Sequence, residues 1–301
     1  MRIYNSLLSA AKFRKVFAFG EREVAHWFPG HMAKGLKQMR ASLRKVDYII
    51  EIHDARISFF FVLNPSFQES LDVRPHILVL NKMDLADTSK KQSILKQLER
   101  EGVRNILFTD CLRQRDENIV PLVTELIESG SRFHREEDRS YCLMVIGVPN
   151  VGKSSLINAI RRTYLKKGKA SKVGGEPGST KAVLTKIQAC ETPLLDTPGV
   201  LPPRLDRNET CTILDHLVGE DVIADYLLFS LNRLERFNYI EKYNLEEPCD
   251  DIQHVLKSIA VNLGKTKRVK AITGVGESIH SMQQPTIRAF RKGELGKVML
   301  D

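Results

Sequence analysis

A lysine and a serine at the end of a glycine loop are the residues of this chain best suited to phosphate chemistry. Lys153 and Ser154 lie in the segment 147–155, which contains the pattern G-x-x-x-x-G-K-[ST]. In such a loop, backbone N–H groups surround the phosphates, the lysine neutralises β- and γ-phosphate charge, and the serine binds Mg²⁺. The apolar run 141–146 predicts a strand before the loop, and residues 156–160 predict a helix after it. The predicted phosphate-binding residues are Pro149, Asn150, Val151, Gly152, Lys153, Ser154 and Ser155.

A second motif favours guanine as the base. Asn81, Lys82, Met83 and Asp84 follow the apolar run 76–80 and form the pattern N-K-x-D. The Asp84 carboxylate can accept hydrogen bonds from N1–H and the N2 amine of guanine, whereas adenine offers neither donor. Adenine would leave polar groups buried and unpaired, so this site discriminates strongly. The motif is short, and its weight comes from its occurrence together with the phosphate loop.

Two further segments supply groups for Mg²⁺ and the γ-phosphate. Asp196 ends an apolar run and opens a D-x-x-G pattern that closes at Gly199. We expect the Asp196 carboxylate to contact Mg²⁺ and the Gly199 N–H to approach the γ-phosphate. Thr180, in the loop 176–180, is predicted to reach Mg²⁺ and the γ-phosphate when GTP binds and to withdraw after hydrolysis. A loop of this composition also occurs without any function.

The order of the motifs is unusual, because N-K-x-D precedes the phosphate loop, whereas ordinary GTPases have it last. The chain therefore looks circularly permuted. Together with the segments 27–34, 53–56 and 290–296, this order resembles the YlqF/RbgA family of ribosome-assembly GTPases, and in particular its mitochondrial branch. The resemblance implies GTP and Mg²⁺ as cofactors, GTP hydrolysis that times late assembly, and translation regulation. It implies binding to the large mitochondrial ribosomal subunit and its rRNA.

The residue that positions the attacking water in Ras-type GTPases has no counterpart here, since Val200 follows Gly199. Two residues are candidates for that role. The segment around Asn150 resembles potassium-stimulated GTPases that share the form G-x-P-N-V-G-K-S, which implies that the Asn150 amide ligates a K⁺ ion that spreads transition-state charge. His31, in the family's F-P-G-H-M motif, is expected to approach the γ-phosphate when a ribosomal precursor is bound.

The resemblance also implies a third guanine contact, made by a turn after the predicted strand 103–108. Thr109 and Asp110 occupy that place, where GTPases usually have a Ser-Ala-like turn whose backbone N–H meets guanine O6. The match in residue type is weak, but backbone contacts tolerate a change of side chain.

Strands and helices alternate through the middle of the chain, which predicts an α/β fold. We expect a circularly permuted P-loop GTPase domain with a mainly parallel sheet and helices on both faces, and the nucleotide at the carboxyl ends of the strands. After Gly199 the alternation stops, and the segments 215–233 and 252–263 predict amphipathic helices. A small all-helical C-terminal domain follows. The predicted division is 1–22, a transit-peptide-like basic segment; 23–206, the permuted GTPase domain; and 207–301, a helical RNA- or ribosome-binding domain.

The charge of the chain favours an acidic partner. The formal net charge is +9, and the segment 252–301 holds nine Lys or Arg against three Asp or Glu, a net of +6. Ribosomal RNA fits this charge, and a solvated surface is the alternative. The five cysteines form no C-x-x-C pair, which argues against a zinc finger.

The first twenty residues carry four cations and no acid, which is typical of a mitochondrial transit peptide. A disordered or structural basic N-terminus is the alternative. We expect a monomer in the mitochondrial matrix, and the cationic helix predicted near residues 34–44 would allow peripheral association with the matrix face of the inner membrane. Two other functions stay open: a non-hydrolysing GTP-binding RNA scaffold, and a tRNA-modification or inner-membrane-associated GTPase.

Overall fold

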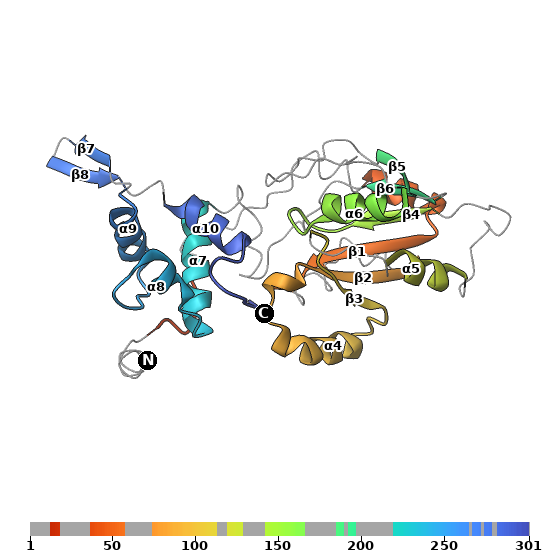
Figure 1. Ribbon diagram of the computed structural model, residues 1–301, viewed down its shortest axis with the longest axis horizontal. Helices are drawn as coiled ribbons and strands as arrows, with labels where there is room; N and C mark the ends of the chain where they lie inside the picture. Colours follow the sequence, from red (N-terminus) through yellow and green to blue (C-terminus); the bar gives the residue numbers. More distant parts are fainter. Residues whose placement is uncertain are drawn as a thin grey trace. The chain divides into compact units, whose positions relative to one another are not determined.

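The chain forms two compact units, seen here in a computed structural model (Figure 1). The structure describes residues 13–18, 37–57, 74–112, 119–128, 142–165, 185–189, 192–196, 219–264, 267–271, 274–278 and 282–300. One unit lies within residues 26–206 and is called the GTPase unit below. The other, called the helical unit, combines residues 13–18 with residues from 219 to 300.

The GTPase unit is built on a six-stranded sheet with the strand order β3-β2-β1-β4-β6-β5. The strands are β1 (Tyr48–Asp54), β2 (His76–Asn81), β3 (Ile106–Phe108), β4 (Leu143–Ile146), β5 (Thr185–Ala189) and β6 (Thr192–Asp196). Neighbouring strands are parallel except for β5, which runs antiparallel to β6. The prediction of a mainly parallel sheet is confirmed, while the edge strand β5 was not predicted.

The central strand β1 is buried along its whole length. Its apolar residues fit a strand covered on both faces, where side chains meet no water. The two polar side chains Glu51 and His53 are buried as a pair, with Oε1 and Nε2 separated by 2.7 Å. A strand of this kind gives the sheet a fixed centre.

Helices connect the strands of the GTPase unit (Figure 1). They are α4 (Lys91–Arg100), α5 (Ile119–Glu128) and α6 (Lys153–Leu165), with the short 3₁₀ helices η1 (Leu43–Lys45), η2 (Met83–Leu85) and η3 (Thr88–Lys90). Helix α4 buries Ile94 and Leu98, which are four residues apart on one face. Residues 37–42 are helical as well, within the predicted cationic helix.

The sheet places the N-K-x-D motif and the phosphate loop on either side of β1. Strand β2, which leads into N-K-x-D, pairs with one edge of β1, and β4, which leads into the phosphate loop, pairs with the other. All three strands are parallel, so their carboxyl ends lie at the same edge of the sheet. Motifs that are far apart in the sequence are therefore neighbours.

The helical unit contains four helices within the described residues, and also a β-hairpin (Figure 1). Its elements are α7 (Glu220–Arg233), α8 (Asn238–Tyr243), α9 (Ile252–Asn262), α10 (Gln283–Arg291), β7 (Lys267–Ala271) and β8 (Gly274–Ser278). The predicted helical character is confirmed, but all-helical is a correction, because β7 and β8 pair antiparallel. Of the predicted helix 215–233, residues 215–218 lie outside the described part.

Residues 13–18 lie against the helical unit rather than apart from it. Phe17 is 6% exposed and packs into a cluster with Ile223, Tyr226, Phe229 and Ile287. The prediction of a targeting segment over residues 1–22 did not foresee this packing. Among the described residues, no helix combines the length and hydropathy needed to cross a bilayer.

Candidate nucleotide-binding site

The phosphate loop leaves β4 at Gly147 and enters α6 at Lys153, as the sequence predicts. The backbone takes positive φ values at Gly147 (150°), Asn150 (63°) and Gly152 (106°). Gly147 and Gly152 allow this backbone because they have no Cβ. The loop ends at the first turn of α6, where backbone N–H groups have no partner within the helix.

Lys153 points its ammonium group into the loop. Its Nζ donates to the carbonyl oxygens of Gly147 at 3.0 Å and Val148 at 2.7 Å, and the residue is 7% exposed. A buried cation enclosed by a loop at a helix N-terminus fits a phosphate group. Ser154 and Ser155 follow in the first turn of α6 and are partly exposed, so their hydroxyls are available to a metal or a phosphate.

Asn81 joins the base motif to the phosphate loop. Its Nδ2 donates to the Val151 carbonyl at 2.8 Å, and its Oδ1 accepts from the Cys111 N–H at 3.1 Å. A Cβ added at Gly152 would lie 2.2 Å from Asn81 Nδ2. Glycine is therefore required at position 152 by the asparagine as well as by the backbone. The two motifs are one physical unit.

Lys82 makes a second link between the motifs. It has a positive φ of 62°, and its Nζ donates to the Asn150 carbonyl at 2.6 Å and to Asp54 Oδ2 at 2.9 Å. Asp54 lies at the end of β1 and also accepts from Arg56, through Nε at 3.0 Å and a terminal nitrogen at 2.8 Å. The Lys82 ammonium group thus joins the end of β1, through Asp54, to the loop after β4, through Asn150.

The charge of Asp54 is maintained although the side chain is buried. Burial acts to raise the pKa of its carboxyl group, but the attraction of Arg56 and Lys82 outweighs burial and holds the pKa well below its ordinary value. The carboxylate therefore stays ionised at neutral pH and continues to hold both cations.

The remaining base-site residues lie on η2 and after β3. Asp84 is half-buried in η2, and the Met83 N–H donates to the Thr109 carbonyl at 3.1 Å. Thr109 and Asp110 are buried, and Asp110 Oδ1 accepts from the Leu112 N–H at 3.2 Å. The structure brings these residues to the sheet edge that holds the phosphate loop.

The predicted metal and switch residues are less fully described. Asp196 ends β6, where its backbone pairs with Val145, beside the strand that carries the phosphate loop. His31, Thr180 and Gly199 lie outside the described residues. Within the described part of the chain, no group of three or more His, Cys, Asp or Glu could hold a metal ion by itself. A Mg²⁺ ion at Ser154 would share its coordination with nucleotide oxygens, which is usual for this ion.

Two polar residues at this edge were not assigned to the site from the sequence. Asp54 ends the buried strand β1 and Arg56 follows it, and the two side chains bond each other with only 3% of each exposed. The available signal was an Asp-x-Arg pattern directly after an apolar run. Such a pattern places both charges at the carboxyl end of a strand, where ligands bind in α/β sheets.

Comparison with known proteins identifies the family. The family model described as "50S ribosome-binding GTPase" matches residues 142–292. A protein of Ictalurus punctatus called "Mitochondrial ribosome-associated GTPase 1" is 74% identical, with all of both chains covered. Its namesake in Xenopus tropicalis is 58% identical over 96% of this chain and 98% of the relative. The chain belongs to this GTPase family.

The GTPase has bacterial relatives too. "Ribosome biogenesis GTPase A" of Bacillus cereus is 30% identical over 92% of this chain and 94% of its own length. In the solved structure of GNP-bound YlqF from T. maritima, the match covers 89% of this chain and 97% of the other, with a TM-score of 0.53 and 20% identity. The predicted YlqF/RbgA-type fold, its mitochondrial branch and the GTPase activity are confirmed.

Proposed function

We propose that this GTPase binds the large mitochondrial ribosomal subunit and hydrolyses GTP to GDP to time late subunit assembly, thereby regulating mitochondrial translation. Support comes from the ribosome-associated and ribosome-biogenesis names of its relatives. The observation that carries the enzymatic part is the pair of bonds from Asn81 and Lys82 to carbonyls of the phosphate loop. These bonds couple base recognition to phosphate binding.

The proposed roles of the site residues follow the sequence analysis. Asp84 selects guanine, while Lys153 neutralises phosphate charge. Mg²⁺ is held by Ser154, Asp196 and, in the GTP state, Thr180. The carbonyl of Asn150 is engaged by Lys82, and its side-chain amide is the proposed K⁺ ligand.

The helical unit is the proposed rRNA-binding surface. It exposes cations on and after two helices, namely Lys257, Arg288, Lys292 and Lys297. The Lys292 side chain is 71% exposed and lies 4.0 Å from Glu294, so its ammonium group remains accessible to a phosphate. We propose that the protein acts as a monomer in the mitochondrial matrix, with peripheral association with the inner membrane.

The test is GTP turnover by the full chain in KCl and in NaCl, with and without large mitochondrial ribosomal subunits. Stimulation by subunits supports the proposed function, and a further dependence on K⁺ supports the role of Asn150. GTP binding without turnover in every condition would refute hydrolysis as the timing step. It would favour a GTP-binding RNA scaffold.

Single substitutions separate the two proposed catalytic groups. Asn150→Ala should abolish stimulation by K⁺, whereas His31→Ala should spare GTP binding and lower the turnover that ribosomal subunits stimulate. Unchanged values for either variant would contradict the role given to that residue.

A further inference from the structure

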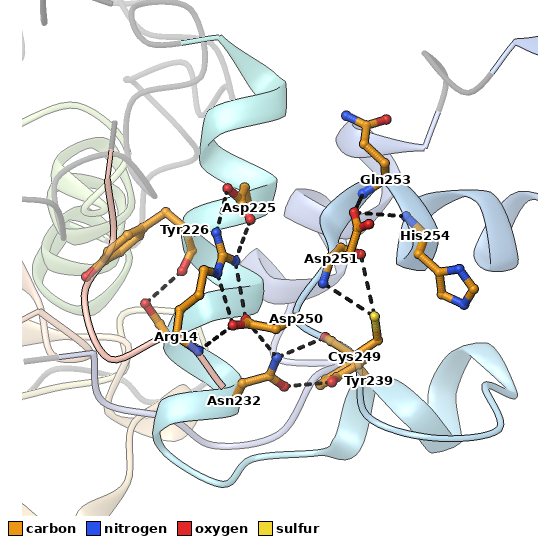
Figure 2. Close-up of polar contacts among 11 residues, drawn as sticks. Arg14, Asp225, Tyr226, Asn232, Tyr239, Cys249, Asp250, Asp251, Gln253 and His254 are labelled. Carbon is orange, nitrogen blue, oxygen red and sulfur yellow. Dashed lines mark hydrogen bonds and ion pairs between the residues drawn. The ribbon is translucent and has the colours of Figure 1, made fainter. Parts of the chain in front are cut away.

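The segment Phe13–Ala18, called the N-terminal strap below, is bound to the helical unit by a charge cluster and an aromatic cluster (Figure 2). The sequence predicts that this segment belongs to a transit-peptide-like basic stretch, with a structural N-terminus as the alternative. Arg14 and Phe17 of the strap contact the helical unit as residues of a folded element do, which limits where a removable leader can end.

Arg14 is the centre of the charge cluster. Its guanidinium group donates to both carboxylate oxygens of Asp225, at 3.1 and 2.7 Å, and its Nε donates to Asp250 at 3.0 Å. The backbone N–H of Arg14 also donates to Asp250. Figure 2 shows the guanidinium between these two acids, one on α7 and one in the turn before α9. Bidentate pairs of this kind are geometrically specific.

The charge cluster continues into the interior of the helical unit. Asn232 on α7 donates to the Cys249 carbonyl at 3.0 Å and accepts from the hydroxyl of Tyr239 on α8 at 2.6 Å. The next residue after Asp250 is Asp251, whose carboxylate caps the first turn of α9. Arg14 therefore contacts α7 through Asp225 and the turn before α9 through Asp250 (Figure 2).

Phe17 anchors the other end of the strap. Its ring lies 5.1 Å from that of Tyr226, edge to face, and 5.5 Å from that of Phe229. The Arg14 guanidinium lies 5.7 Å from the centre of the Phe17 ring and 5.7 Å from that of Phe229. These distances are within the range of a cation–π interaction. Loss of the strap would expose an aromatic surface on α7.

Loss of the strap would also remove the cation that joins Asp225 and Asp250. The two carboxylates are partly buried, with side chains 22% and 14% exposed. Carboxylates that share a cation repel each other when the cation is removed, and partial burial increases that cost. Val16, in the same segment, is 79% exposed, so its side chain contributes little to the binding of the strap.

We propose that the N-terminal strap is a permanent part of the helical unit, so any leader removed on import ends before Phe13. This inference rests on the proposed mitochondrial location. A processing peptidase hydrolyses one peptide bond, consumes one water and releases the leader. Cleavage after Arg14 would remove the cation that joins Asp225 and Asp250, and cleavage after Phe17 would remove the aromatic anchor as well.

The first experiment determines the N-terminal residue of the protein recovered from mitochondria, by mass spectrometry of its N-terminal peptide. An N-terminus at Phe13 or earlier is expected. An N-terminus after Phe13 would overturn the proposal, whatever the protein does on the ribosome.

The second experiment measures amide hydrogen exchange of α7 in full-chain variants. Arg14→Ala and Phe17→Ala should each raise exchange in α7 by about ten-fold or more, because local opening becomes easier. Val16→Ser, a control in the same segment, should leave it unchanged. Unchanged exchange in both anchor variants would show that the strap is dispensable. GTP binding is measured on the same samples. If the unsubstituted protein does not bind GTP, that result counts against the proposed function and leaves the inference about the strap unaffected.

Discussion

Replacing Asp54 by asparagine should lower both the stability of the GTPase unit and its affinity for GTP. The substitution keeps the shape of the side chain and removes the charge that holds Arg56 and Lys82. Breaking a buried ion pair by changing one partner costs about 3–5 kcal/mol. For a unit of this size, about 3 kcal/mol lowers the unfolding midpoint by roughly 6–12 °C.

The pH dependence gives a second signature of Asp54. Its pKa is lower in the folded protein than in the unfolded chain. The folded state thus binds this proton more weakly, so the stabilisation is complete above a pH of about 4 and is lost as the pH falls further. Asp54→Asn should lack this part of the acid sensitivity.

Thermal unfolding followed by circular dichroism between pH 3 and pH 7, together with GTP titration, measures both effects. Losing a charged hydrogen bond to Lys82 should weaken GTP binding by about ten-fold. Glu99→Gln is the matched control, because Glu99 is exposed on α4 and undergoes the same chemical change. A midpoint of Asp54→Asn within 2 °C of the unsubstituted protein, or unchanged GTP affinity, would refute the reasoning.

Two further substitutions test other contacts. Gly152→Ala should reduce GTP affinity by more than about ten-fold, because its Cβ would lie 2.2 Å from Asn81 Nδ2. Gly102→Ala controls for backbone strain, since Gly102 has a positive φ but no atom within 4 Å of an added Cβ. Equal GTP affinities in the two variants would contradict the steric argument. Tyr239→Phe should cost about 1–3 kcal/mol in the free energy of unfolding of the helical unit, because Asn232 loses a buried donor. Denaturant unfolding measures this cost, and a change in GTP binding would be unexpected.

The central strands and the phosphate loop were predictable because their signals are contiguous in sequence. Strand β4, the loop and α6 follow one another from Leu143 to Leu165, so apolar runs and a local motif suffice. The hairpin of β7 and β8 was missed because neither strand contains an apolar run: β7 reads K-R-V-K-A and β8 reads G-V-G-E-S. Edge strand β5, T-K-I-Q-A, also lacks an apolar run.

The contacts that define the site were less accessible to sequence reasoning. Lys82 was assigned to the base motif, but its bond to Asp54 spans 28 positions and depends on the pairing of β1 with β2. The strap is a stronger example, because composition alone makes residues 1–20 resemble a leader. Only the folded chain shows that Arg14 and Phe17 have partners.

The order in which the chain is synthesised has a consequence for the strap. Arg14 is made early, but its partners Asp225 and Asp250 lie 211 and 236 positions later. Domains fold as they emerge, and contacts across such separations form slowly. The strap therefore cannot bind until the chain as far as Asp250 is available, so this early segment is among the last to reach its place. Until then the Phe17 side chain lacks the cluster that buries it, and an exposed aromatic side chain is a surface that chaperones bind.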